Sequence, residues 1–146
     1  MILKELEKIV KDERESGMRD DYVRNVLKEY LQVYVLSFVY TNSSYNKDLI
    51  FTGGTCLRHL YELERLSEDV DFDYVKDLDS KKLADDLNDY FSKKYKYSGA
   101  VISLKQKGGQ ILIKFPVLDK LNLQYAGGSN FLYVKMDVSP LPSKNY

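Results

Sequence analysis

A glycine turn that joins an apolar segment to an alternating acidic segment constrains the fold of this chain more than any other feature. Residues 51–74 read FTGGTCLRHLYELERLSEDVDFDY. Leu49–Thr52 is typical of a short buried strand that stops at Gly53-Gly54, and Asp69–Val75 alternates as a half-buried strand does. Cys56–Glu64, between them, predicts a short helix. This order of elements indicates an α/β (α+β) fold, a mixed sheet with helices packed on it.

The rest of the sequence supplies further helices and strands. Before the first strand, apolar spacing predicts a helix over Leu3–Asp12, an interruption at Gly17, and a second helix that Asp20 or Asp21 would cap. Pro140 and Pro142 are expected to end regular structure near the C-terminus. The elements predicted after the acidic strand are a helix over Ser80–Tyr95, two strands over Val101–Lys105 and Gln110–Val117 that form a hairpin, and a last strand over Phe131–Val138. We therefore expect a single domain over residues 1–146, with N-terminal helices in 1–48 and a sheet core in 49–138.

Composition excludes several classes of protein. The chain has 146 residues, 44% of them hydrophobic, which is enough to build one core. Lys and Arg together number 22, as do Asp and Glu, so the overall charge attracts neither nucleic acid nor an anionic membrane. Cys56 is the single cysteine, which excludes a disulfide framework. No apolar run approaches the roughly 20 residues of a membrane span, and no signal region follows Met1, so we expect a cytoplasmic protein without a membrane partner.

Carboxylates on one strand face indicate a cation site. Side chains alternate along a strand, so Asp69, Asp71 and Asp73 share one face. The Cα atoms of Asp69 and Asp71 are about 6.5–7 Å apart along a strand. Two bare charges at that distance repel by roughly 2–2.5 kcal/mol at an effective dielectric constant of about 20. A divalent cation with a preference for oxygen ligands, Mg²⁺ or Mn²⁺, would offset this repulsion, and Asp73 is interpreted as a solvated neighbour.

The last predicted strand offers a third carboxylate. In FLYVKMDV, the apolar residues on one face leave Asp137 on the polar face. If this strand lies beside Asp69–Val75, Asp137 can join Asp69 and Asp71 as a metal ligand and accept a proton from an attacking hydroxyl. The alternative is an exposed strand residue with no such role.

The glycine turn is a candidate phosphate site. Gly53 and Gly54 let the backbone approach a ligand closely, and the following helix N-terminus favours phosphate. Thr55 could add a hydroxyl donor, and Arg65 a planar donor pair. The alternatives are a tight structural turn for the glycines, an ion pair for Arg65, and a local backbone hydrogen bond for Ser67.

These residues together resemble a known family. Gly53, Gly54 and Thr55, followed by Arg65, Ser67, Asp69, Asp71 and Phe72, are similar to the first motif of the nucleotidyltransferase-fold superfamily, and more narrowly to the AbiEii/AbiGii toxin family. Lys135 and Asp137 are similar to that family's third carboxylate motif. The resemblance is strong over residues 49–75, moderate over 131–138 and weak elsewhere.

The resemblance implies a function and its partners. It implies Mg²⁺-dependent transfer of a nucleoside monophosphate from a nucleoside triphosphate to an acceptor, with Asp69, Asp71 and Asp137 as catalytic and metal-binding residues. It also implies nucleotide binding by Gly53, Gly54, Thr55, Arg65 and Ser67. RNA or tRNA as acceptor and a cognate antitoxin are the implied macromolecular partners. Relatives continue into a helical region after the third carboxylate, whereas this sequence stops at Tyr146. The alternatives are therefore a non-catalytic module that binds nucleotide or a partner, or a structural interaction domain.

Overall fold

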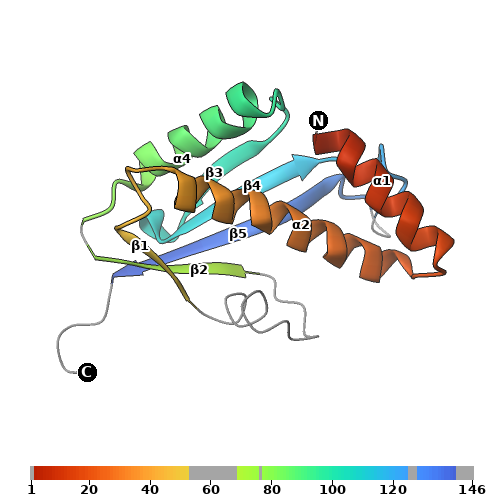
Figure 1. Ribbon diagram of the computed structural model, residues 1–146, viewed down its shortest axis with the longest axis horizontal. Coiled ribbons are helices and arrows are strands. Elements are labelled where there is room, and N and C mark those ends of the chain that lie inside the picture. The colour runs from red at the N-terminus through yellow and green to blue at the C-terminus, as the bar shows by residue number, and fades with distance from the viewer. Residues whose placement is uncertain (1, 53–68, 76, 125–127, 141–146) are drawn as a thin grey trace.

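In the part of the chain that the structure describes, five strands form one mixed sheet in the order β1-β2-β5-β4-β3 (Figure 1). The computed structural model describes residues 2–52, 69–75, 77–124 and 128–140, so the helix predicted over Cys56–Glu64 lies outside the described residues. Among these described strands, β2 and β5 are the one parallel pair, and the other neighbours are antiparallel. The strands are β1 (Leu49–Thr52), β2 (Asp69–Tyr74), β3 (Val101–Lys105), β4 (Gln110–Pro116) and β5 (Phe131–Pro140). Each begins at the residue where the sequence predicts it, so the mixed α+β fold is confirmed.

The described helices also follow the predicted positions. They are α1 (Ile2–Glu15), α2 (Asp20–Thr41) and α4 (Ser80–Asp89), which continues into the π-helical turn η1 (Tyr90–Lys94). The sequence predicts one regular helix to Tyr95, but the π-helical turn replaces its last part. Within the described residues, no helix combines the length and the apolar character that crossing a membrane requires.

The break between α1 and α2 depends on glycine. Gly17 has a φ of +79°, a left-handed conformation that is costly for other residues. The backbone N–H of Gly17 donates to Arg14 O at 3.0 Å and that of Met18 donates to Glu13 O at 3.1 Å, which is the pattern of a Schellman helix end. The predicted cap of α2 is wrong: Arg19 occupies the N-cap position without a side-chain hydrogen bond. Asp20 and Asp21 instead lie in the first turn, where the helix dipole favours negative charge.

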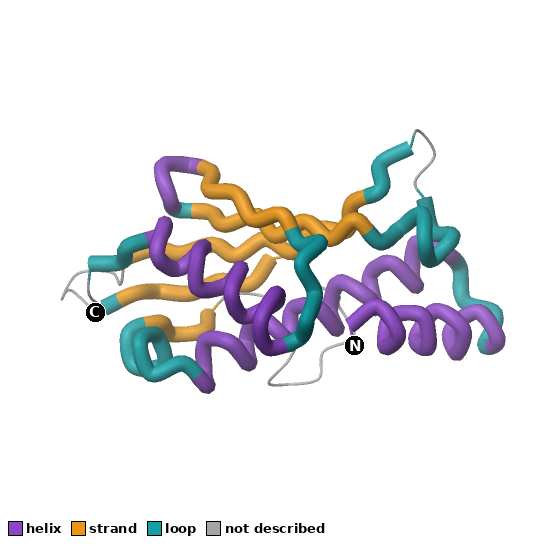
Figure 2. The backbone as a smooth tube through the Cα atoms, turned by 90° about the horizontal axis from the view of Figure 1, so that it is seen from above, coloured by secondary structure: helices purple, strands orange, loops and turns teal. Residues whose placement is uncertain are grey.

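All three described α-helices lie on the same face of the sheet (Figure 2). Alternate strand residues on that face are buried, among them Phe72 of β2, Ile113 of β4 and Met136 of β5. Leu27 and Leu31 of α2 pack into the same core and are fully buried. The remaining strand residues are half-buried or exposed. The sheet therefore presents its second face, where the acidic residues lie, without a described helix over it.

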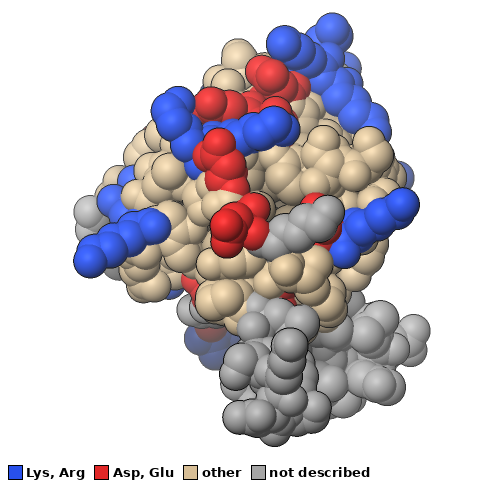
Figure 3. Space-filling view, turned by 90° about the vertical axis from the view of Figure 1, so that its left-hand side faces the viewer, with Lys and Arg blue, Asp and Glu red and all other residues tan. Residues whose placement is uncertain are grey.

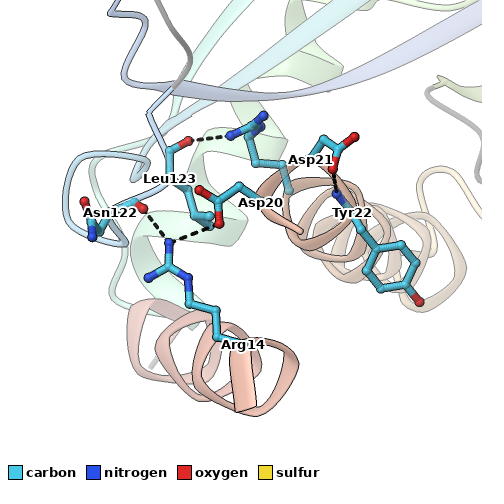
Figure 4. A network of polar contacts seen from close by, with 7 residues as sticks. Arg14, Asp20, Asp21, Tyr22, Asn122 and Leu123 are labelled. Atoms are coloured by element: carbon cyan, nitrogen blue, oxygen red, sulfur yellow. Dashed lines mark hydrogen bonds and ion pairs between the residues drawn. The ribbon is translucent and has the colours of Figure 1, made fainter. Parts of the chain in front are cut away.

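Two arginines join the N-terminal helices to the segment that precedes β5 (Figure 4). Arg14 Nη2 donates to the carbonyl oxygen of Asn122 at 2.5 Å and lies 3.4 Å from Asp20 Oδ1. Arg24 Nη1 donates to the carbonyl oxygen of Leu123 at 3.0 Å. These bonds satisfy carbonyl groups of an irregular segment whose apolar side chains are buried, so they fix the approach of the chain to β5.

The β3–β4 hairpin agrees with the sequence-based prediction, whereas the end of β5 does not. The hairpin between β3 and β4 forms as predicted, through the 3₁₀ turn η2 (Gln106–Gly108), in which Gln106 and Lys107 both have positive φ. β5 extends through Pro140, beyond the predicted end at Val138. Pro140 pairs with Tyr74 at the last position of the parallel ladder, a strand end where proline is tolerated.

Candidate functional site

Two of the three predicted carboxylates, Asp71 and Asp137, lie in one row across the face of the sheet that no described helix covers. Asp71 of β2 is in register with Asp137 of β5, and the strands are parallel neighbours. Thr52 of β1 is in register with Asp71, and Gln110 of β4 is in register with Asp137. Neighbouring strands are about 4.8 Å apart, so Asp71 and Asp137 are closer at the backbone than two acids spaced along one strand. The adjacency on which the sequence-based cation site depends is therefore present.

Burial on the opposite face fixes the direction of the two acids. Phe72 and Val138, the residues that follow Asp71 and Asp137, are 1% and 5% exposed in the core. Because side chains alternate along a strand, Asp71 and Asp137 project from the other face and are half-buried there. Thr52 Oγ1 lies 3.5 Å from the backbone oxygen of Asp71, at the limit of a hydrogen bond.

Gln110 holds the carboxylate of Asp137. Its Nε2 donates to Asp137 Oδ1 at 2.9 Å across the β4–β5 pair. This amide leaves the second carboxylate oxygen available for another ligand, and it fixes the orientation of the group. Sequence reasoning places Gln110 only at the start of a strand. The signal that would have found it is the register of β4 with β5, which a strand pattern does not contain.

The described donors suit a hard divalent cation. Two aspartates on adjacent strands supply oxygen atoms, the ligands that Mg²⁺ and Mn²⁺ prefer. In residues 2–52, 69–75, 77–124 and 128–140, no group of three His, Cys, Asp or Glu side chains is close enough to hold a metal ion. Asp69 is the first residue of β2 and pairs with Lys135, but its side chain lies outside the described part. The described site is thus a carboxylate pair.

The predicted nucleotide-binding residues are not among those described. Gly53, Gly54, Thr55, Arg65 and Ser67 all fall within residues 53–68. β1 ends at Thr52, in the same row as Asp71 and Asp137, so Gly53 follows in the sequence directly after the level of the acid pair. Their roles stay predictions.

The second Asp-x-Asp pair in the chain, Asp77 and Asp79, has no part in the carboxylate row. Asp79 caps α4, where its Oδ1 accepts a hydrogen bond from Lys82 N at 3.1 Å. Asp77 is exposed in the preceding loop. The pair does not lie on a strand, and its carboxylates therefore do not share a face with Asp71 and Asp137.

Charges of both signs alternate near the start of α4 (Figure 3). Three ion pairs at helical spacing follow the helix: Lys81–Asp85 at 3.4 Å, Lys82–Asp86 at 2.8 Å and Lys93–Asp89 at 3.6 Å. Burial acts to raise the pKa of the Asp86 carboxyl, but hydrogen bonds from Lys82 and Tyr45 outweigh it and hold that pKa below its usual value. The paired charges give this surface no strong field of one sign.

Comparison with known proteins assigns the family. The family model described as nucleotidyl transferase AbiEii toxin, type IV toxin–antitoxin system, matches residues 37–143. That range begins within α2 and includes all five strands of the sheet. No curated protein and no solved structure matches the chain significantly. The matched range contains Asp71, Asp137 and the Gly53-Gly54 pair. The chain therefore belongs to the AbiEii family of nucleotidyltransferase toxins of type IV toxin–antitoxin systems.

Proposed function

We propose that this chain transfers a nucleoside monophosphate from a nucleoside triphosphate to an acceptor, with RNA, including tRNA, as the acceptor class. The observation that carries the proposal is the register of Asp71 with Asp137 on the uncovered face of the sheet. Membership of a nucleotidyltransferase family supports the reaction type. The same membership supports a cognate antitoxin as a protein partner.

The residues divide the chemistry among them. Asp71 and Asp137, together with Asp69, would hold Mg²⁺ or Mn²⁺, which when bound would neutralise charge on the phosphates. Gln110 keeps the carboxylate of Asp137 oriented through its 2.9 Å hydrogen bond. Asp137 accepts the proton of the acceptor hydroxyl as the new oxygen–phosphorus bond forms. The bond from the α-phosphorus to the bridging oxygen breaks, and pyrophosphate leaves with the electron pair.

The glycine turn has the complementary role of holding the leaving group. Backbone N–H groups of Gly53, Gly54 and Thr55 would bind the β- and γ-phosphates, because glycine leaves the amides accessible. Arg65 and Ser67 would donate further hydrogen bonds to phosphate oxygens. The position of Thr52 beside Asp71 supports this arrangement, since the turn follows Thr52 directly in the chain.

Two measurements test the proposal on the Asp71→Asn variant. Isothermal titration calorimetry with Mn²⁺ and each nucleoside triphosphate should show binding to the wild-type chain and a loss of at least tenfold in the variant. Incubation with α-³²P-labelled triphosphates and total RNA should label RNA only with the wild-type chain. Asparagine keeps the size of the side chain and removes its charge, so the difference reports the carboxylate.

Asp73→Asn is the matched control. Asp73 lies on the same strand and face, two residues further from the row, in register with Ser139. We expect its binding and labelling to equal those of the wild type. Equal heats for the wild-type and Asp71→Asn chains would refute the site. Metal-dependent nucleotide binding without any transfer of label would indicate the non-catalytic module instead.

A further inference from the structure

A small cavity lies where α2 meets β4 and β5, and its strand residues alternate in step with the carboxylate row. Its volume is about 280 Å³, and the described residues that line it are Lys28, Leu112, Tyr133 and Lys135. The volume is just below the range of about 300–1,000 Å³ that is usual for small-molecule sites. The cavity thus fits one ring system with its substituents better than a folded macromolecule.

The cavity lies along β5 from Asp137, at an angle to the carboxylate row. Lys135 precedes Asp137 by two residues and Tyr133 precedes it by four, so all three share one face. At about 3.3 Å per residue, Lys135 lies about 7 Å and Tyr133 about 13 Å from Asp137 along the strand. Leu112 is the register partner of Lys135 on β4. One extended ligand held at Asp137 would therefore pass Lys135 before reaching Tyr133.

The lining combines positive charge with an apolar ring. Lys28 comes from α2 and Lys135 from β5, and within the described part of the chain neither ammonium group has an ion-pair partner. A third cation is close, because Lys114 Nζ lies 5.9 Å from the centroid of the Tyr133 ring. No described lining residue is acidic. Cations beside an aromatic ring and a leucine match an anion that carries a planar ring.

We infer that this cavity binds the nucleoside end of the incoming triphosphate. The base packs against Tyr133 and Leu112, Lys135 contacts the α-phosphate, and Lys28 donates to a polar atom of the nucleoside. The inference rests on the proposed function, since it places the phosphates at the Asp71–Asp137 row. It adds a recognition element from α2, an element outside the sheet.

The test separates the nucleoside from its phosphates. Calorimetry in the presence of Mn²⁺ compares each nucleoside triphosphate with inorganic tripolyphosphate, for the wild-type chain and for Tyr133→Leu and Lys28→Gln. Loss of a stacking platform should weaken triphosphate binding roughly tenfold in Tyr133→Leu and leave tripolyphosphate unchanged. Lys28→Gln should lower the affinity for the nucleoside triphosphate and leave the affinity for tripolyphosphate unchanged. Tyr133→Phe keeps the ring and should restore affinity to within about twofold.

Two control variants and three possible outcomes separate a failure of this inference from a failure of the proposed function. Tyr22→Leu on the exposed surface of α2 and Lys81→Gln on α4 should bind both ligands as the wild type does. If the cavity variants keep full nucleoside triphosphate affinity while Asp71→Asn loses it, the inference fails and the proposed function stands. If they lose affinity for single-stranded RNA alone, the cavity serves the acceptor and the inference also fails. If the wild-type chain binds neither triphosphate nor tripolyphosphate, both fail.

Discussion

One hydrogen bond links a residue that has no obvious chemistry to the proposed site. Gln110 donates to Asp137 at 2.9 Å, and Gln110→Leu removes that donor while keeping a side chain of similar size. Loss of a partner that orients a metal ligand typically costs about 10–100-fold in metal affinity. We expect Mn²⁺ affinity, measured by calorimetry, to fall about tenfold or more in Gln110→Leu.

A charged replacement gives a second readout of the same contact. Gln110→Glu places a carboxylate beside Asp137, and a like charge raises the pKa of the group next to it. The pH at which half of the Mn²⁺ affinity is lost should therefore rise relative to the wild type. Gln124→Leu, an exposed position before β5, is the control and should change neither quantity. If both Gln110 variants bind Mn²⁺ with the affinity and pH dependence of the wild type, Gln110 does not support the proposed metal site.

The turn before β1 is joined to α4 by a hydrogen bond between elements. Tyr45, 5% exposed, donates its hydroxyl to Asp86 Oδ2 at 2.5 Å, and Lys82 bonds the same oxygen at 2.8 Å. These bonds lower the pKa of Asp86 against the opposing effect of burial. A lowered folded pKa contributes stability that is present above the ordinary value of 3.8 and lost as the pH falls through the folded value.

Tyr45→Phe should therefore destabilise the chain in a pH-dependent way. At pH 7 we expect a loss of about 1.5–3 kcal/mol in the free energy of unfolding, the range for a hydrogen bond to a charged group. The difference from wild type should shrink below pH 3.8, because Asp86 becomes protonated in both proteins. Urea unfolding of both proteins at pH 7, 5, 4 and 3 measures this difference in the free energy of unfolding. A difference that stays constant over this range would contradict the assigned cause.

At the scale of the whole molecule, the described helices cover one face of the sheet and leave the other to the proposed site. Ile113 and Leu112 are consecutive residues of β4 that point to opposite faces, and Ile113 is fully buried while Leu112 is half-buried. Truncation of a buried isoleucine to alanine costs about 2–5 kcal/mol. We expect Ile113→Ala to lose that much in urea unfolding, and Leu112→Ala to lose less than half of it. Equal losses would mean that both faces are packed as core.

Much of the fold was predictable because its signals are local. Periodicity located α1, α2 and the five strands, and Gly17 marked the break between the two helices. Details of the helix ends were not predicted: α2 starts at Arg19 without a side-chain cap, and a π-helical turn follows Asp89. β5 ends at Pro140, as expected of a proline, but it runs two residues beyond the predicted end at Val138, because the last position of a parallel ladder tolerates proline.

The sequence by itself determined which residues each element contains and which side chains share a face, because alternation along a strand is a property of neighbouring residues. Apart from the β3–β4 hairpin, which the sequence predicts, the tertiary structure decided which strands pair and in what register. Asp71 and Asp137 are far apart in the chain, and only the parallel pairing of β2 with β5 puts them side by side. The same holds for the bond from Gln110 and for the approach of Lys28 to Tyr133, since contacts between distant segments follow from packing of the whole core.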